Sequence, residues 1–275
     1  MSLQIEPSGA VLTLQLNRPD RLNAINEATA QQLLAALHHA DQSPDIRVIV
    51  LRGNGRAFCA GRDISEPPTP VILSLVQAVS TAMVRCSKAI VCAVHGWVVG
   101  AGVEWMLDSD IVIAARSARF KLPEAEIGVF VTGGIVATLP AMAGMARAKG
   151  MLLLGEAFNA VDAERWGLIW KVVDDEAFDA EVARVAQKLA ALQPDVVHRF
   201  KRVLNEVGLA AFDKAIALET EMQTELQSSA PPLSSFEISP LHGDVSQPSL
   251  RRAGATSERD AHRIAAGDVQ QPDYC

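Results

Sequence analysis

The carboxylate with the most unusual surroundings in this sequence is Glu104, which lies in the run GWVVGAGVEWMLDSD (96–110). Apolar residues flank it, and Gly100, Ala101 and Gly102 precede it. Small residues allow the backbone to come close to a ligand. A buried carboxylate is costly unless it is paired or has a chemical task. Glu104 is therefore a candidate catalytic residue.

A second carboxylate, Glu124, follows in FKLPEAEIG (120–128). The segment between it and Glu104 predicts a short helix and a returning strand. At ~1.5 Å per helical residue and ~3.3 Å per strand residue, the chain can come back to its starting point. Two facing glutamates of different protonation could share general acid and general base work. The spacing permits this arrangement without requiring it, because a glutamate after a proline is also a common first residue of a helix.

Two loops in the sequence have the same design, a buried strand followed by a turn of small residues. They are IVLRGNGRAFCAGRD (49–63) and AIVCAVHGWVVGAGVE (89–104). If the turns lie side by side, they could aim two backbone N–H groups at one oxygen as an oxyanion hole, each donor contributing roughly 3–4 kcal/mol. The second turn opens a helix, whose dipole adds to this effect. The glycines alone are equally compatible with two tight strand-to-helix turns.

Alternating strands and helices must position these loops. Hydrophobic periodicity predicts strands at 11–16, 46–53, 89–94, 110–115 and 168–173, and helices at 27–41, 71–86, 102–108, 133–154, 162–166, 176–192 and 195–226. This alternation predicts a layered α/β core with right-handed crossovers. From about residue 227 the chain is poor in aliphatic residues and rich in Ser, Pro, Gly and Arg, which predicts a poorly ordered tail.

The composition limits the classes of function. The 275 residues are 49% hydrophobic and 21% charged, as in a globular protein with a real core, and the net charge of −7 argues against nucleic-acid or anionic-membrane partners. The scattered cysteines (Cys59, Cys86, Cys92 and Cys275) favour free thiols and no metal site. With no signal peptide or membrane span evident, we expect a cytoplasmic protein. No Ser or Cys has an evident base partner, so a hydrolytic triad is not expected.

Four stretches together resemble the crotonase, or enoyl-CoA hydratase/isomerase, superfamily. NRPDRLNA (17–24) is similar to the family's N-R-P-x-x-x-N-A segment, and AFCAGRDI (57–64) to its first oxyanion loop. AVHGWVVGAGVEWMLDSDIVIA (93–114) is similar to the second oxyanion loop, and ARFKLPEAEIG (118–128) to A-x-F-x-x-P-E-x-x-x-G. The four occur in order and at matching separations, and the resemblance covers about residues 3–226.

The resemblance implies an enoyl-CoA hydratase that converts an enoyl-CoA thioester into a 3-hydroxyacyl-CoA. It places the oxyanion-hole donors at Ala60 and Ala101, with Glu104 activating water and Glu124 delivering a proton. It implies no metal and no cofactor, because the CoA thioester is the substrate. An isomerase of the same fold, or an inactive acyl-CoA-binding protein, remains an alternative. The residues implied to bind substrate or CoA are Ala60, Gly61, Arg62, Asp63 and Ala101.

The resemblance also implies a fold, a spiral of ββα units with a C-terminal helical trimerisation region, and a homotrimer or homohexamer. On this basis we expect a crotonase-like core at 1–190, a helical region at 191–226 and an atypical tail at 227–275. Trp97, Trp105 and Phe130 are bulky where the family is often smaller, and they are candidates for shaping the acyl pocket. For the two tryptophans, packing in the core is the competing explanation.

Overall fold

The computed structural model describes residues 1–65, 69–229, 236–238 and 250–252. The chain divides into two units, Met1–Ala230 and Pro231–Cys275, which are described separately. In the second unit, β10 (Phe236–Ile238) pairs antiparallel with β11 (Leu250–Arg252). Of the tail predicted at 227–275, only these strands and the last turn of the helix that ends at Ser229 are among the described residues.

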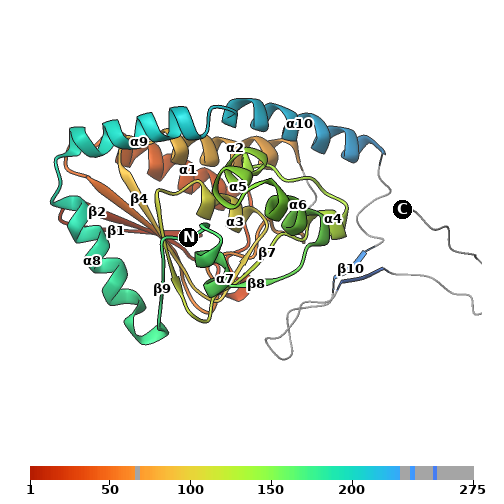
Figure 1. The fold of residues 1–275 in the computed structure, drawn as a ribbon, viewed down its shortest axis with the longest axis horizontal. Coiled ribbons are helices and arrows are strands. Elements are labelled where there is room, and N and C mark those ends of the chain that lie inside the picture. The colour runs from red at the N-terminus through yellow and green to blue at the C-terminus, as the bar shows by residue number, and fades with distance from the viewer. Residues whose placement is uncertain (66–68, 230–235, 239–249, 253–275) are drawn as a thin grey trace, which may run out of the picture. The chain divides into compact units, whose positions relative to one another are not determined.

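The first unit is built on a six-stranded sheet of order β1-β2-β3-β4-β6-β9 (Figure 1). β1 pairs antiparallel with β2, and every other pair in this sheet is parallel. The central strand β4 has all six residues buried, as expected for a parallel strand covered on both faces. The strands are β1 Leu3–Ser8, β2 Val11–Leu16, β3 Val48–Gly53, β4 Ala89–Val94, β6 Ile111–Ala115 and β9 Lys171–Val173.

A second, three-stranded sheet of order β5-β7-β8 lies beside the candidate loops. β5 (Trp97–Val99) follows β4 after a two-residue turn and pairs parallel with β7 (Arg119–Lys121). β7 pairs antiparallel with β8 (Phe158–Asn159). These strands were not predicted, because runs of two or three residues carry no readable periodicity.

Helices cover both faces of the large sheet. α8 packs on one face, where Phe178, Val182 and Val185 meet Val50 and other strand residues in a small apolar cluster. The larger core lies on the other face, under α1, α2 and α3, and α9 and α10 run roughly end to end along that side (Figure 1). The helices are α1 Glu27–Gln42, α2 Pro70–Arg85, α3 Ala101–Leu107, α4 Glu124–Ile127, α5 Ile135–Ala143, α6 Met145–Leu154, α7 Ala160–Arg165, α8 Phe178–Ala190, α9 Pro194–Gly208 and α10 Phe212–Ser229, with 3-10 turns at Pro19–Arg21 and Asp175–Ala177.

Two of the predicted helices are each divided in two. The helix expected at 133–154 breaks at Gly144, whose φ of +80° ends α5 and starts α6 in a new direction. The helix expected at 195–226 breaks between Gly208 and Phe212. The helix predicted from residue 27 does begin there, and the Asn26 side chain caps it by accepting the Thr29 N–H at 3.0 Å.

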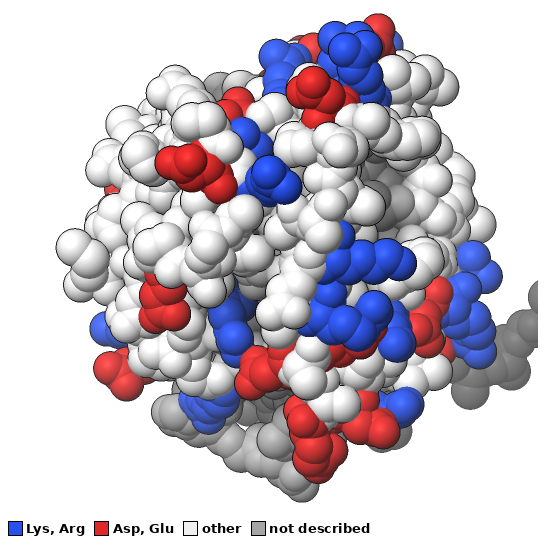
Figure 2. All heavy atoms as spheres, turned by 90° about the vertical axis from the view of Figure 1, so that its left-hand side faces the viewer, with Lys and Arg blue, Asp and Glu red and all other residues white. Residues whose placement is uncertain are grey.

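The charged surface is mixed in sign. On the face shown in Figure 2, basic and acidic side chains lie close to one another among broad uncharged areas. Surface ion pairs include Arg52 with Asp179 at 2.8 Å and Arg184 with Glu181 at 2.7 Å. Within the described part of the chain, none of the helices combines the length and the apolarity needed to cross a membrane.

Candidate active site

The two small-residue loops lie side by side, which is one of the two arrangements that the sequence left open. The Cys59 N–H donates to the Trp97 carbonyl at 3.2 Å, and the Val99 N–H donates to the Cys59 carbonyl at 2.9 Å. The glycines allow this approach: a Cβ on Gly102 would lie 2.8 Å from the Cys59 carbonyl oxygen. Gly61 has φ +82°, and a Cβ there would lie 2.8 Å from the Val99 oxygen. The loop after β3 and the loop before α3 therefore form one backbone surface.

The two backbone N–H groups expected to form the oxyanion hole both lie on this surface, and they differ in whether they already have a hydrogen-bond acceptor. Ala101 is the first residue of α3, so its N–H has no acceptor within the helix. The Ala60 N–H donates to the Leu22 carbonyl at 3.0 Å. A thioester oxygen at Ala60 would therefore have to share or replace that bond. Leu22 and Asn23 both have positive φ, +50° and +56°, a backbone strain that turns the Leu22 carbonyl toward the loop.

Side chains of the NRPDRLNA segment (17–24) bind the first loop through hydrogen bonds and an ion pair. The buried Asn23 amide donates to the carbonyls of Asn54 and Ala57, both at 2.8 Å. Arg18 forms an ion pair with Asp63 at 2.8 Å, and the Asp63 side chain also accepts the Ser65 hydroxyl at 2.6 Å. These hydrogen bonds hold the pKa of Asp63 below its ordinary value against the opposing effect of burial. Asp63, predicted to contact CoA, is thus tied into the loop.

Glu104 is buried and has both carboxylate oxygens bound. The Thr132 N–H donates to Oε1 at 2.9 Å, and the Thr132 hydroxyl donates to Oε2 at 3.0 Å. Burial raises the pKa of Glu104, and the hydrogen bonds from Thr132 and from the Gly133 backbone oppose that rise. Donors aimed at a carboxylate favour its charged form. The geometry therefore favours Glu104 as the base of the pair.

Glu124, in the first turn of α4, is also buried, but its carboxyl group has fewer hydrogen-bond partners than that of Glu104. Its Oε2 has no hydrogen-bond partner among the described residues. A Cβ on Gly100 would lie 2.7 Å from its Oε1, which places the Glu124 carboxyl directly against the second small-residue loop. Burial, and then the nearby charge of Glu104, raise the pKa of Glu124 to about 8. At neutral pH this carboxyl holds a proton that it can donate.

Two further buried acids near Glu104 were not found by sequence analysis. Asp108 lies one helical turn after Glu104, and burial, together with the charges of Glu104 and Glu219, raises its pKa well above the ordinary value, while the Ser80 hydroxyl opposes the rise. Glu219 comes from α10, and burial and the charge of Glu104 raise its pKa to about 8. The i, i+4 spacing from Glu104 is a signal that could have identified Asp108, whereas nothing in the sequence connects Glu219 to this site.

The three bulky candidates for the acyl pocket occupy different environments. Trp105 is fully buried in the main core, and its indole N–H has no partner within the described ranges. Trp97 is half-buried in β5, and Phe130 is half-buried against the same core. Cys59, next to Ala60, is also fully buried, and burial raises the pKa of its thiol to about 12, so it is not a nucleophile at neutral pH.

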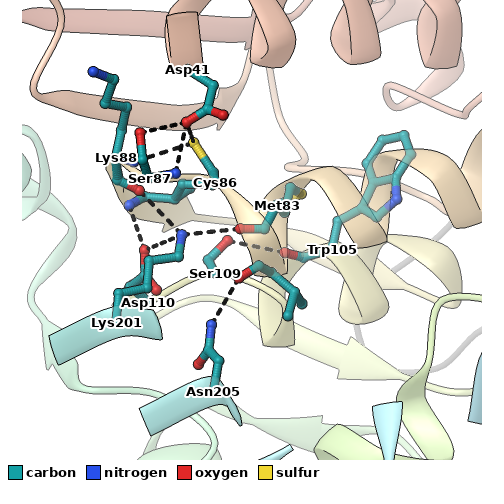
Figure 3. Close-up of polar contacts among 12 residues, drawn as sticks. Asp41, Met83, Cys86, Ser87, Lys88, Trp105, Ser109, Asp110, Lys201 and Asn205 are labelled. Atoms are coloured by element: carbon teal, nitrogen blue, oxygen red, sulfur yellow. Dashed lines mark hydrogen bonds and ion pairs between the residues drawn. The ribbon is translucent and has the colours of Figure 1, made fainter. Parts of the chain in front are cut away.

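A polar network around the buried Lys201 lies next to the segment that follows α3 (Figure 3). The Lys201 ammonium on α9 pairs with Asp110 at 2.8 Å and donates to the carbonyls of Met83 and Lys88 at 3.0 and 3.1 Å. Asp110 also accepts the Ile90 N–H at 2.7 Å, so α9, α2 and β4 are held together behind the site. In the part of the chain that the structure describes, no group of three or more His, Cys, Asp and Glu side chains is placed to hold a metal.

Several known proteins resemble this chain in sequence and in structure. A family model described as enoyl-CoA hydratase/isomerase matches residues 6–235. The chain is 37% identical over 223 residues to the 1,2-epoxyphenylacetyl-CoA isomerase of Escherichia coli K12, covering 78% of this chain and 85% of that one. It is 35% identical over 239 residues to a probable enoyl-CoA hydratase of Rhodobacter capsulatus, covering 83% and 91%.

Among solved structures, an enoyl-CoA hydratase from Mycobacterium avium subsp. paratuberculosis superposes with a TM-score of 0.81 at 30% sequence identity, covering 85% of this chain and 96% of that one. The predicted crotonase fold is therefore confirmed. The chain belongs to the enoyl-CoA hydratase/isomerase family.

Proposed function

We propose that the protein is an enoyl-CoA hydratase that adds water across the 2,3 double bond of an enoyl-CoA thioester. The observation that carries this proposal is the pairing of Glu104 with Glu124. Both are buried, and the charge of Glu104 adds to the effect of burial in raising the pKa of Glu124. Glu104 has donors on both oxygens, whereas Glu124 is raised to a pKa of about 8. This difference supports a division into base and acid.

In the proposed reaction Glu104 accepts a proton from water while the water oxygen bonds to Cβ of the substrate. The electrons of the double bond move toward the thioester oxygen, which the N–H groups of Ala60 and Ala101 stabilise. Glu124 then gives its proton to Cα. This leaves Glu104 protonated and Glu124 ionised, and one proton transfer between them restores the starting state. The atoms of water are fully accounted for in the 3-hydroxyacyl-CoA.

The second candidate is a double-bond isomerase. One relative at 37% identity is named as an isomerase of a CoA thioester, which favours keeping this alternative. Isomerisation needs the oxyanion hole and one carboxylate to move a proton between two carbons, with no water. An inactive acyl-CoA-binding protein is a third outcome of the experiment below.

The test is an assay of the wild-type protein with crotonyl-CoA and with cinnamoyl-CoA, following the loss of conjugated enoyl-thioester absorbance and the appearance of the 3-hydroxyacyl product. Glu104→Gln and Glu124→Gln are each expected to lower kcat by roughly 10²–10⁴-fold, because each removes one proton-transfer group. A preference for cinnamoyl-CoA would indicate that Trp97 and Phe130 border a pocket for aromatic acyl groups. If neither thioester is hydrated but a 3-enoyl-CoA is isomerised, the hydratase proposal is wrong.

We also propose that copies of the chain associate through α9. Its exposed side carries a stripe of apolar residues at helical spacing. The exposed fractions of the side chains are 49% for Val196, 67% for Phe200, 51% for Val203 and 75% for Val207. A stripe of this kind on one surface helix is typical of a helix that meets another surface. A trimer would cover it.

A further inference from the structure

Two side chains of α10 bind the backbone of the segment that joins α4 to α5. This segment, Phe130–Val136, includes the first two residues of α5 and is called the base loop below because it holds Glu104. The Gln223 side-chain oxygen accepts the Phe130 N–H at 2.6 Å. The Glu219 carboxylate accepts the Gly134 N–H at 2.6 Å and the Val136 N–H at 3.0 Å. Both side chains are buried, and their i, i+4 spacing places them on one face of α10.

Between these two attachments lies the contact that orients the proposed base. Thr132 binds both oxygens of Glu104, through its N–H at 2.9 Å and its hydroxyl at 3.0 Å. A Cβ on Gly133 would lie 2.8 Å from Glu104 Oε2, so the base loop also packs directly against that carboxylate. The position of Glu104 therefore depends on the conformation of the base loop.

The base loop needs support from elsewhere in the chain. It contains two consecutive glycines, and Gly134 has φ +82°. Glycine has the greatest backbone freedom, so this segment has a large entropy to lose when it is held in one conformation. Gly134 is also the residue before α5, and it has no side chain to cap the first N–H groups of that helix. Glu219 supplies the missing acceptor from a distant helix.

α10 is itself anchored, so it can act as a fixed support. The Gln77 amide on α2 donates to the Thr220 hydroxyl at 2.8 Å, and Arg85 at the end of α2 pairs with Asp213 at 2.5 Å. α10 also contacts α5 directly. The face that carries Glu219 and Gln223 is thereby held over the base loop.

We propose that Glu219 and Gln223 are positioning residues that hold the base loop in the conformation in which Thr132 orients Glu104. The hold of Glu219 and Gln223 on the base loop is called the clamp below, and it rests on the hydrogen bonds alone. Its consequence for catalysis rests on the proposed function. It makes α10 part of the support of the proposed active site. An amide at 219 has one acceptor oxygen and an N–H₂ group that cannot accept, so at least one of the two backbone N–H groups loses its acceptor.

Two measurements test the proposal, each on the full chain. The variants are Glu219→Gln and Gln223→Leu, and the control is Glu221→Gln, the same chemical change on the exposed side of α10. Hydrogen–deuterium exchange followed by mass spectrometry is expected to show faster exchange of the peptide spanning 130–136 in both variants and not in the control. This readout needs no activity.

The kinetic measurement uses the same assay as the proposed function. Glu219→Gln is expected to lower kcat at least roughly tenfold with KM within about twofold, because a misplaced base affects the chemical step more than binding. A double variant with Thr132→Val is expected to lose little more than the worse single variant, since both changes release the same contact on Glu104. The control is expected to keep wild-type kcat.

The outcomes separate the two proposals. Unchanged exchange at 130–136 in both variants overturns the clamp, whatever the activity. Faster exchange with unchanged kcat, or additive losses in the double variant, overturns the positioning role. If the wild type turns over neither thioester, the proposed function fails, while the exchange data still decide whether the clamp exists.

Discussion

Replacing Glu124 by glutamine is expected to make the protein more stable at neutral pH while removing its activity. The side chains have the same shape, so the change deletes an ionisable group and leaves the packing. In the folded protein the pKa of Glu124 is about 8, against an ordinary value of 4.5, with burial as the main cause. The unfolded chain therefore loses this proton at a lower pH than the folded chain does.

The sign and the size of the effect follow from proton linkage. Between pH 4.5 and about 8 the folded state binds more protons than the unfolded state, so the free energy of unfolding falls as pH rises. Each pKa unit corresponds to 1.36 kcal/mol, so the wild type loses about 3 kcal/mol between pH 4.5 and pH 7 through this group. Glutamine has no such loss. Glu219 has the same raised pKa in both proteins, so its contribution cancels in the difference.

The assay is equilibrium urea unfolding of wild type and Glu124→Gln at pH 5, 6, 7 and 8. The difference in the free energy of unfolding is expected to be small at pH 5 and to grow in favour of the variant by about 1 kcal/mol per pH unit. Glu156→Gln, on an exposed residue, is the matched control and should follow the wild type at every pH. A stability difference that stays constant from pH 5 to 8 would show that Glu124 is ionised in the folded protein, and the assignment of Glu124 as the acid would be refuted.

Two further predictions address the base and the assembly. Gly133→Ala is expected to lower kcat by roughly two orders of magnitude, because its Cβ would lie 2.7 Å from the Ser80 hydroxyl and 2.8 Å from Glu104 Oε2 and would displace Glu104. Steady-state kinetics would measure the loss, and a circular dichroism melt would show whether the variant is folded. A folded variant with wild-type kcat would contradict the prediction. Phe200→Glu on α9 is expected to convert an oligomer into smaller species in light scattering after gel filtration, since it puts a charge into the apolar stripe; an unchanged mass would show that α9 is not the interface.

Much of the fold could be read from the sequence because the relevant signals are local. The run AIVCAV predicts a strand covered on both faces, and it forms β4 with every residue buried. The glycines of the two small-residue loops predict close backbone approach, and Gly61 and Gly102 lie where a Cβ would collide with the opposite loop. Hydrophobic spacing and small residues have the same meaning wherever they occur in a chain.

Tertiary structure alone decided the parts of the site that join distant segments. Thr132 binds Glu104 across 28 positions, and Glu219 binds Gly134 across 85, distances at which no spacing rule operates. The pKa values of the two glutamates also could not be predicted from the sequence, because they depend on burial and on which carboxylate oxygens accept hydrogen bonds. The sequence determined which residues are candidates for the chemistry. Only the tertiary structure decided their surroundings and hence their pKa values, because desolvation and hydrogen bonding depend on neighbours that folding brings together.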